Sequence, residues 1–382
     1  MRSILYFHKP LKHGGDIHMS ERIICNLNLD EDFESFEELC ILSFGERTNQ
    51  DLNMHRWMFD ENPYNPNGQN LMYVLKEENK IIGADGLIPF ELYVNGKTVI
   101  AAHSVKSMTH PDYKRQGIFR MMTDNSVESG RNNGVDLIIG LANKNSYPAY
   151  EKFGWPTLYE KEVYIRPINI ANKMKEKIKI GFLANLSGGL YKCFDKLRLS
   201  PKNMLKKLNA SVKELDSIPE EITEYWDKFK DKYNVLIVRD YKYLNYRYNK
   251  RPDVKYKTLL INSGEEKIGF VVLRETLANN SKMVSVAENF TDPDNEEYIG
   301  AIAEAIINYC YKINAEYVVV GTGLYGMYKD TLLKYGFTKN KKSLINNMMI
   351  AKSLSDKVSA DELMGHEIWH ITQGDGETEL DL

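Results

Sequence analysis

The most informative part of this sequence runs Ser107-Met108-Thr109-His110-Pro111-Asp112-Tyr113-Lys114-Arg115-Gln116-Gly117-Ile118-Phe119-Arg120. Its pattern predicts the end of a strand, a short basic loop and the start of a helix. Backbone N–H groups in the first turn of a helix lack partners, and with the helix dipole they favour a bound phosphate. Lys114, Arg115 and Arg120 add positive charge, and Gly117 lets a ligand approach the backbone closely. The stretch therefore predicts an anion-binding loop.

The segments around this loop indicate an α/β domain with a mixed sheet. Asn95-Gly96 is typical of a two-residue hairpin turn between strands. Asp32 is the expected N-cap of an early helix, because apolar residues recur after it at helical spacing. The predicted strands are 23–27, 71–75, 81–89, 99–109 and 137–141, and the predicted helices begin at 32, 118 and 146, the second ending at 132.

A second stretch follows about one helix later and runs Gly140-Leu141-Ala142-Asn143-Lys144-Asn145-Ser146-Tyr147-Pro148-Ala149-Tyr150-Glu151-Lys152-Phe153-Gly154-Trp155. Together the two stretches resemble the GNAT superfamily of acyl-CoA N-acyltransferases. That family has a pyrophosphate loop of pattern Arg/Gln-x-x-Gly-x-Gly/Ala, and an Asn…Tyr-x-x-x-Gly-aromatic helix beside the thioester. Lys114 stands at the Arg/Gln position and Gly117 matches, whereas Phe119 replaces the second small residue.

The resemblance implies acetyl-CoA as co-substrate, with no metal, and assigns roles to particular residues. Tyr150 is the expected acid for the leaving thiolate, with Tyr147 in reserve. The expected base is His103, and Asp85 and Glu91 are alternatives. The residues assigned to CoA binding are Met108, Thr109, Lys114, Arg115, Gln116, Gly117, Ile118, Phe119, Arg120, Asn143 and Asn145.

The second half of the chain repeats the order of the first. Asn62-Pro63 compares with Arg251-Pro252 at an offset of 189, and Ile82-Gly83 with Ile268-Gly269 at 186. The segment 288–297, which this offset equates with the anion-binding loop, contains five acidic residues and no basic one. A pyrophosphate there would meet like charges, so one acyl-CoA site per chain is predicted.

The predicted fold class is therefore α/β (an α+β mixed sheet), with two tandem GNAT-like domains, the second degenerate, joined by a basic helical connector. The layout is similar to bacterial two-domain GNAT proteins, including Eis-like and surface-polysaccharide-associated acetyltransferases. The predicted parts are a leader at 1–18, a catalytic domain at 19–166, a connector at 167–216 and a degenerate domain with a C-terminal tail at 217–382. The leader is a hypothesis, because Gly14-Gly15-Asp16 can be encoded as a ribosome-binding sequence shortly before Met19.

Charge and composition exclude several classes of function. Lys plus Arg total 50 and Asp plus Glu total 53, a net charge of -3 that argues against a nucleic-acid binder. The four cysteines lie far apart and read as reduced thiols of a cytoplasmic protein. No apolar run approaches the length of a transmembrane helix. Residues 166–216 carry a net charge of +8 and a leucine-rich helical face, which indicates either packing on a domain or weak contact with anionic lipid.

The acidic residues at 375–382 form a tail that either is solvated or receives a cationic amine. Nearby, His366-Glu367-Ile368-Trp369-His370 fits the H-E-x-x-H pattern of zinc proteases. That motif needs a helix and a third ligand, whereas 369–372 reads as a closing strand. We therefore expect no metal.

The predicted activity is transfer of an acetyl group from acetyl-CoA to a primary amine of a small-molecule or sugar-linked acceptor, by direct attack in a ternary complex. The alternative is a non-catalytic acyl-CoA-binding sensor or scaffold.

Overall fold

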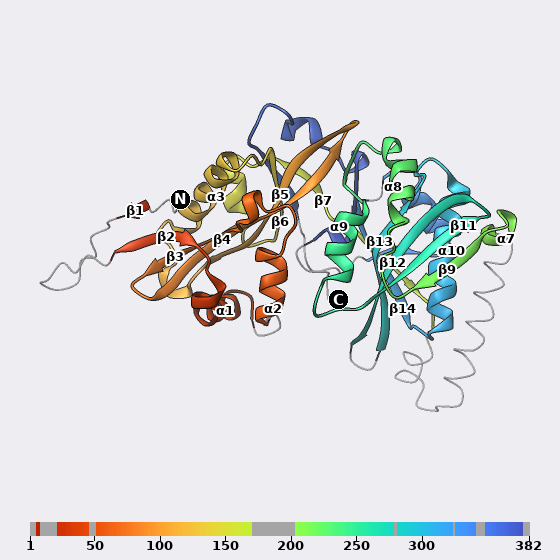
Figure 1. The fold of residues 1–382 in the computed structure, drawn as a ribbon, viewed down its shortest axis with the longest axis horizontal. Coiled ribbons are helices and arrows are strands. Elements are labelled where there is room, and N and C mark those ends of the chain that lie inside the picture. The colour runs from red at the N-terminus through yellow and green to blue at the C-terminus, as the bar shows by residue number, and fades with distance from the viewer. Residues whose placement is uncertain are drawn as a thin grey trace, which may run out of the picture. The chain divides into compact units, whose positions relative to one another are not determined.

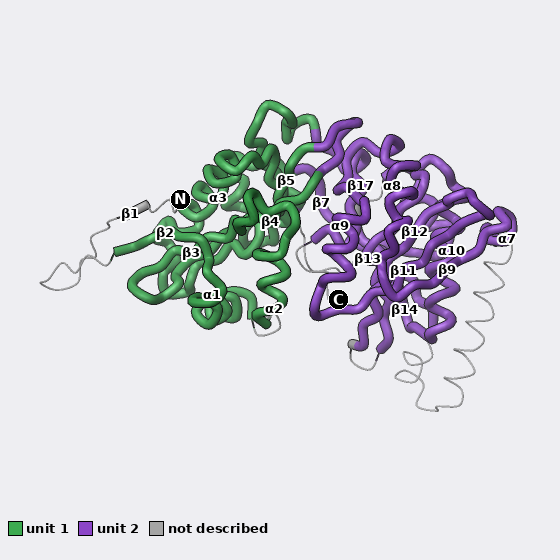
Figure 2. Tube along the Cα trace, viewed as in Figure 1, with its two compact units in different colours: residues 1–91, 99–157, 349–362 green, residues 92–98, 158–348, 363–382 purple. Residues whose placement is uncertain are grey.

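A computed structural model describes residues 5–7, 21–45, 51–169, 203–278, 281–323, 325–340 and 348–376. The chain forms two compact units (Figure 2), each assembled from separate stretches of sequence. Unit 1 comprises Met1–Glu91, Val99–Thr157 and Met349–Glu362, and unit 2 comprises Leu92–Thr98, Leu158–Met348 and Leu363–Leu382. The units therefore do not follow the predicted boundaries along the chain. The proposed leader, apart from a short strand at Leu5–Phe7, and residues 170–202 of the connector lie outside the described residues.

Unit 1 is a mixed sheet covered by helices (Figure 1). Its elements are β2 (Arg22–Asn26), α1 (Leu29–Phe44), α2 (Leu52–His55), β3 (Leu71–Glu77), β4 (Lys80–Val94), β5 (Lys97–Thr109), α3 (Ile118–Asn132), β6 (Leu137–Ala142), α4 (Tyr147–Lys152) and the start of β7 (Thr157–Glu160). Strands β2, β3 and β4 pair antiparallel, and β1 (Leu5–Phe7) pairs antiparallel with β2. Strand β5 pairs parallel with β6 over Ala101–His103. Helix α3 packs on the strands through Ile118 and Met122, which join Ile24, Leu75 and Ile82 in one buried cluster.

Local chemistry explains where these elements begin and turn. Asn95 and Gly96 have φ of 47° and 86°, the left-handed values that a type I′ hairpin turn requires. The N-cap of α1 is Asn28, whose side chain accepts from the Asp30 N–H, so the prediction of Asp32 as the cap is wrong. The helix begins earlier because Asp32 instead accepts from the backbone N–H of Asn28 at 3.2 Å and pairs with Lys76 at 2.6 Å.

Strand β5 contains a bulge that decides which side chains share a face. Lys106, in the middle of the strand, has φ of 53°. A residue in this left-handed conformation adds one position to the strand and shifts the alternation of side chains. Ser104 and Ser107, three positions apart, therefore point to the same face, and both reach the hydroxyl of Tyr150.

Unit 2 repeats this order of elements with several additions. Its elements are β8 (Val163–Pro167), α7 (Met204–Lys207), β9 (Ser211–Leu215), α8 (Ile222–Phe229), β10 (Val235–Ile237), α9 (Tyr241–Leu244), β11 (Tyr256–Ser263), β12 (Glu266–Ala278), β13 (Ser281–Thr291), α10 (Glu296–Lys312), β14 (Tyr317–Gly323), α11 (Tyr328–Lys334), β15 (Thr338–Lys339) and β17 (Trp369–Thr372). One of the additions is β10, which lies between α8 and α9. Strands β9, β11, β12 and β13 pair antiparallel, and β13 pairs parallel with β14.

The two units also share a detail of helix capping, down to one equivalent hydrogen bond. Helices α2 and α9 each have four residues and run directly into a five-residue π-helix. Asp51 caps α2 by accepting from the N–H of Met54, and Asp240 caps α9 by accepting from the N–H of Tyr243, both at 2.9 Å. The two aspartates stand 189 residues apart, which is the offset of the repeated prolines.

Each unit is completed by a strand from the other half of the sequence. Strand β8 pairs antiparallel with β14 in unit 2, and the Ile168 N–H that follows it donates to the Glu316 carbonyl at 2.7 Å. Strand β16 (Met348–Ser353) pairs with β6 and β7, and the Leu354 N–H donates to the Asp136 carbonyl at 2.8 Å in unit 1. The first half of the sequence thus supplies β8 to unit 2, and the second half supplies β16 to unit 1.

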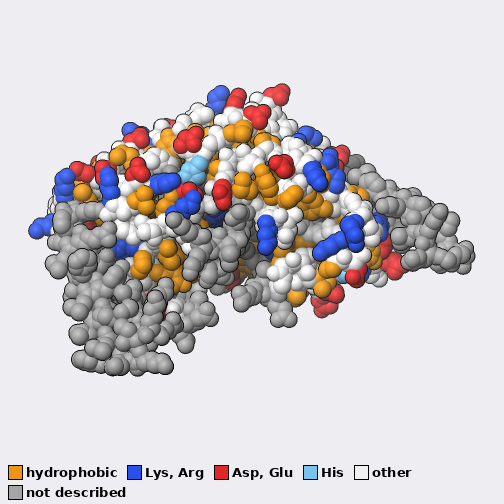
Figure 3. Space-filling model, turned by 180° about the vertical axis from the view of Figure 1, so that it is seen from behind, with side chains coloured by type: hydrophobic (Ala, Val, Ile, Leu, Met, Phe, Trp, Pro, Cys, Tyr) orange, Lys and Arg blue, Asp and Glu red, His pale blue; other side chains and the backbone are white. Residues whose placement is uncertain are grey.

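The surface carries charges of both signs. Figure 3 shows Lys and Arg interspersed with Asp and Glu over the described part of the face that it draws. This mixture agrees with the net charge of -3. Among the described residues, no helix is both long enough and apolar enough to cross a bilayer.

Candidate functional site

The loop that joins β5 to α3 presents uncapped backbone N–H groups. It begins with a short turn at Pro111–Tyr113, after which Arg115 and Gly117 have φ of 63° and 81°. Gly117 is the N-cap of α3, and among the described residues this cap makes no side-chain hydrogen bond to the helix end. A Cβ atom on Gly117 would meet no heavy atom within 4 Å, so the space in front of the helix is open. These features suit an anion bound by main-chain groups.

The side chains of this loop take different positions. Lys114 and Arg115 are exposed and add positive charge beside the open helix end. The side chain of Gln116 accepts a hydrogen bond from Arg22 at 2.9 Å, so its backbone rather than its amide is left for a ligand. Ile118 is buried in the core cluster, and only its backbone remains for a ligand. Arg120 pairs with Asp124 at 2.7 Å and lies over the ring of Phe153.

Phe119 connects the loop to the second predicted stretch. Its ring contacts Tyr150 and Phe153, with centroids 5.4 and 5.9 Å apart. Trp155 packs on Tyr150 from another side at 5.0 Å. The departure of Phe119 from the family pattern therefore has a physical role, because its ring helps to enclose Tyr150.

Tyr150 is the centre of a buried chain of hydroxyl groups. It is only 4% exposed, and its hydroxyl lies 2.9 Å from Ser107 Oγ and 3.3 Å from Ser104 Oγ. Ser107 also donates a hydrogen bond to Oδ1 of Asp85. Burial raises the pKa of Tyr150, and the charge of Asp85 raises it further. Sequence reasoning assigned no role to either serine, because the bulge at Lys106 has no sequence signal of its own.

Asp85 is a buried carboxyl group at the end of this chain. It is 1% exposed, and burial raises its pKa to about 6 against the opposing effect of Ser107 and Ser126. No described residue forms an ion pair with Asp85, and its Oδ2 has no hydrogen bond of normal geometry. A carboxyl in this setting gains or loses a proton near neutral pH.

The remaining predicted residues on β4 and β5 lie nearby. His103 is half-buried, and its ring lies 4.5 Å from that of Phe90. Because side chains alternate along a strand, His103 points to the opposite face from Ser104. Met108 is buried, and the Thr109 hydroxyl is buried without a hydrogen bond among the described residues. Glu91 is half-buried.

The residues before α4 organise the turn that leads into the helix. The side chain of Asn143 accepts from the backbone N–H groups of Asn145 and Ser146 at 2.9 and 3.2 Å. Asn143 and Asn145 are both exposed. The hydroxyl of Tyr147, the reserve acid, lies 3.0 Å from Thr157 Oγ1, whereas that of Tyr150 lies on Ser104 and Ser107.

The corresponding part of unit 2 lacks each of these features. Helix α10 begins after Asn295, whose side chain accepts from the N–H groups of Glu297 and Tyr298 and so occupies the helix end. The offsets of 186 and 182 place Val271 and Leu332 where unit 1 has Asp85 and Tyr150. The acidic loop itself spans only 292–295, because Glu288 lies within β13 and is buried. The prediction that Glu288 belongs to this loop is therefore wrong.

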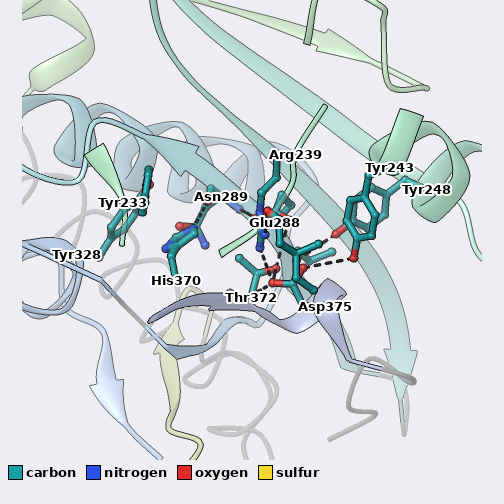
Figure 4. Close-up of polar contacts among 12 residues, drawn as sticks. Tyr233, Arg239, Tyr243, Tyr248, Glu288, Asn289, Tyr328, His370, Thr372 and Asp375 are labelled. Carbon is teal, nitrogen blue, oxygen red and sulfur yellow. Dashed lines mark hydrogen bonds and ion pairs between the residues drawn. The ribbon is translucent and has the colours of Figure 1, made fainter. Parts of the chain in front are cut away.

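Glu288 belongs instead to a buried polar network in unit 2, shown in Figure 4. Arg239, fully buried, lies between the carboxylates of Glu288, at 3.3 Å, and Asp375. Burial and the charge of Asp375 raise the pKa of Glu288 to about 8, although Arg239 opposes them. The prediction that Asp375 belongs to a solvated or substrate-binding tail is wrong, because Arg239 holds it in the interior. Residues 377–382 lie outside the described residues.

The H-E-x-x-H pattern does not form a zinc motif. His366–Ile368 is one 3-10 turn and Trp369–Thr372 is β17, so no helix presents the two histidines on one face. The expected closing strand is thus confirmed. His370 Nε2 donates to the Asn289 carbonyl at 2.8 Å, and its ring packs against Tyr233 and Tyr328. The described residues contain no cluster of His, Cys, Asp and Glu suited to a metal ion.

The fold has clear relatives among solved structures. A GCN5-related N-acetyltransferase from Anabaena variabilis matches with a TM-score of 0.61 at 10% identity, over 87% of this chain and 73% of that one. Eis1 from Mycobacterium abscessus matches with a TM-score of 0.51 at 11% identity, over the same shares. Saccharomyces cerevisiae N-myristoyltransferase with bound myristoyl-CoA matches with a TM-score of 0.55 at 12% identity, over 90% and 83%. At these identities the likeness concerns the fold.

In unit 1 a bulged strand, a glycine-started helix and a buried tyrosine thus lie together on one mixed sheet. The model of the acetyltransferase (GNAT) domain family matches residues 26–158. Residues 26–158 are therefore a GNAT-like domain, and over 87% of its length the chain shares the fold of a GCN5-related N-acetyltransferase. A search of curated protein sequences finds no match.

Proposed function

We propose that unit 1 transfers an acetyl group from acetyl-CoA to a primary amine of a small or sugar-linked acceptor, by direct attack in a ternary complex. One observation carries this proposal. Phe119, in the first turn of α3, contacts Tyr150, so the open helix end and the buried hydroxyl lie at one place in unit 1. A cofactor that has both a pyrophosphate and a thioester needs these two groups close together.

The cofactor contacts follow from the loop geometry. The N–H groups at the start of α3 would hold the pyrophosphate, with Lys114 and Arg115 neutralising part of its charge. The capped and acidic start of α10 is unsuited to the same ligand. Both observations favour one acyl-CoA site per chain, in unit 1.

Two proton transfers accompany the reaction. A primary ammonium with a pKa of about 10.4 must lose a proton before its nitrogen can attack, either to a side chain directly or through water. The leaving thiolate must gain a proton, and Tyr150 is the proposed donor. Oxyanion stabilisation falls to a backbone N–H near Met108 or Thr109. Use of acetyl-CoA, together with four cysteines that lie far apart in the sequence, supports a cytoplasmic location.

The test is thiol release from acetyl-CoA with a panel of primary amines, comparing the wild type with Tyr150→Phe. Loss of the donor hydroxyl is expected to lower kcat by about 100-fold or more, since general acid catalysis contributes at least that much. The affinity for CoA, measured by calorimetry, should change less than about threefold, because the phenyl ring keeps its packing on Phe119 and Trp155.

Tyr147→Phe is the matched control, because it removes one hydroxyl from the same helix at a site bonded to Thr157. It should keep most of the activity. Binding of CoA without turnover of any amine would overturn the enzyme proposal and favour an acyl-CoA sensor. Equal losses in the two variants would overturn the assignment of Tyr150.

A further inference from the structure

Unit 1 contains a continuous hydrogen-bonded path that ends on a carboxyl group with no charged partner among the described residues. The path runs from Asp85 Oδ1 to Ser107 Oγ, and then over 2.9 Å to the hydroxyl of Tyr150. Asp85 and Tyr150 are both nearly inaccessible to solvent. A buried carboxyl normally pairs with a cation or accepts several hydrogen bonds, yet Asp85 forms no ion pair with a described residue and meets the hydroxyls of Ser107 and Ser126 instead.

We propose that Asp85 is the proton store for Tyr150, delivering its proton through Ser107 when the thiolate leaves. This inference rests on the proposed acetyltransferase function and extends it. In the active form Asp85 carries the proton, Asp85 donates to Ser107, Ser107 donates to Tyr150, and Tyr150 donates toward the sulfur. Each hydroxyl can donate its one proton and accept another on an oxygen lone pair, which is what a relay requires.

The step balances as follows. The amine nitrogen bonds to the carbonyl carbon, and the C–S bond breaks with its electron pair on sulfur. The sulfur takes the hydroxyl proton of Tyr150. The Tyr150 oxygen takes the hydroxyl proton of Ser107, and the Ser107 oxygen takes the carboxyl proton of Asp85. Asp85 is left as a carboxylate, the proton lost by the amine passes to the base, and solvent returns a proton to Asp85 after the products leave. The products are the amide and the free thiol of CoA.

The relay solves a problem that burial creates for Tyr150. If Tyr150 gave its proton alone, a tyrosinate would remain in an apolar cluster, and burial opposes that anion. With the relay, the negative charge passes to Asp85, whose pKa is about 6. Because a thiol has a pKa of about 8.5, transfer from the carboxyl to the thiolate runs downhill.

The experiment measures acetyl transfer in H2O–D2O mixtures for the wild type, Asp85→Asn and Ser107→Ala. A relay moves several protons in one step, so the wild-type rate should depend on deuterium fraction along a curve. Asp85→Asn keeps a donor for Ser107 but has no proton to release, so kcat should fall about 100-fold and the dependence should become linear. Ser107→Ala should cause the same changes, and the double variant should be no slower than either single one, because both interrupt one path.

The pH profile provides a second readout. After correction for the free-base fraction of the amine, the wild-type rate should fall as pH rises above about 6, since protonated Asp85 is lost. Asp85→Asn should lack this limb, and Asp85→Glu should restore both the limb and part of the rate.

Two matched observations separate the relay from a structural role. Ser104→Ala removes another hydroxyl that lies near the Tyr150 hydroxyl, at 3.3 Å, and should retain the curved isotope dependence. If the wild type turns over but Asp85→Asn shows the same curvature and pH limb, the relay is overturned and the acetyltransferase stands. If the wild type transfers no acetyl group to any amine, the proposed function is overturned, and the relay with it.

Discussion

The buried histidine of unit 2 makes the stability of the protein depend on pH in a calculable way. Burial lowers the pKa of His370 to about 3, and the charge of Arg239 acts in the same direction. Its Nε2–H donates to the Asn289 carbonyl, which fixes the neutral form. In the unfolded chain the pKa of this histidine is 6.5, so between pH 6.5 and about pH 3 the unfolded state binds a proton that the folded state does not bind. Stability is therefore present above pH 6.5 and is lost progressively as the pH falls toward 3.

The perturbation is His370→Gln, which keeps an N–H donor and removes the titrating ring. Between pH 8 and pH 5 the linkage amounts to about 2 kcal/mol, obtained from 1.36 kcal/mol per pKa unit over roughly 1.5 units below the unfolded value. The free energy of unfolding of the wild type should fall by that much more than that of the variant. The variant also loses ring packing on Tyr233 and Tyr328, but this loss does not depend on pH.

The assay is urea denaturation of the full chain at several pH values, followed by circular dichroism. The quantity to compare is the difference in the free energy of unfolding between wild type and variant at each pH. This difference is needed because Glu288 contributes a pH dependence of the opposite sign to both proteins. Its pKa is raised to about 8, so its contribution favours the folded state at low pH and is lost as the pH rises. Parallel pH profiles in the two proteins would refute the reasoning, since they would mean that folded His370 accepts a proton as readily as the unfolded chain.

Two further predictions concern the loop and the repeated caps. Gly117→Glu places a carboxylate at the open end of α3 and should weaken CoA binding at least about tenfold by calorimetry. Gly134→Glu, with a similar φ of 77° and equally open space, is the control that should keep CoA affinity, and similar losses in both would point to backbone strain. Asp51→Ala and Asp240→Ala should each cost about 1 kcal/mol of unfolding free energy by urea denaturation, and Asp51→Asn much less. A marked difference between the two alanine variants would contradict the equivalence of the two caps.

Much of the local structure of unit 1 could be predicted from the sequence. The helix at 118–132 appears as α3 with the predicted ends, because Gly117 starts it and the apolar period fixes its buried face. The hairpin at Asn95-Gly96 forms because these residues adopt left-handed conformations easily. These signals are local, and each depends on a few neighbouring residues.

The parts that could not be predicted depend on distant partners or on unusual backbone. A lysine gives no indication of the left-handed bulge that aligns Ser104 with Ser107, since that position usually favours glycine. Asp375 looked like one acid in an exposed tail, but its partner Arg239 stands 136 residues earlier. Asp85 was only an alternative base, because its burial and its bond to Ser107 arise from the packing of β4, β5 and α3.

The exchange of β8 and β16 has a consequence for how the protein is made. On the ribosome, the sheet of unit 1 waits for residues 349–362, which emerge only after most of unit 2 has been synthesised. Until then, the Asp136 carbonyl lacks the hydrogen bond that the Leu354 N–H donates to it. The Leu354 side chain, which lies within 3 Å of where a Cβ on Gly130 would be, is also not yet in place. In many proteins an N-terminal domain folds completely before the next domain is synthesised. Unit 1 of this chain cannot follow that order. Unit 1 is therefore completed only together with unit 2, and a nascent chain released early would expose an unpaired sheet edge to chaperones and to other copies of itself.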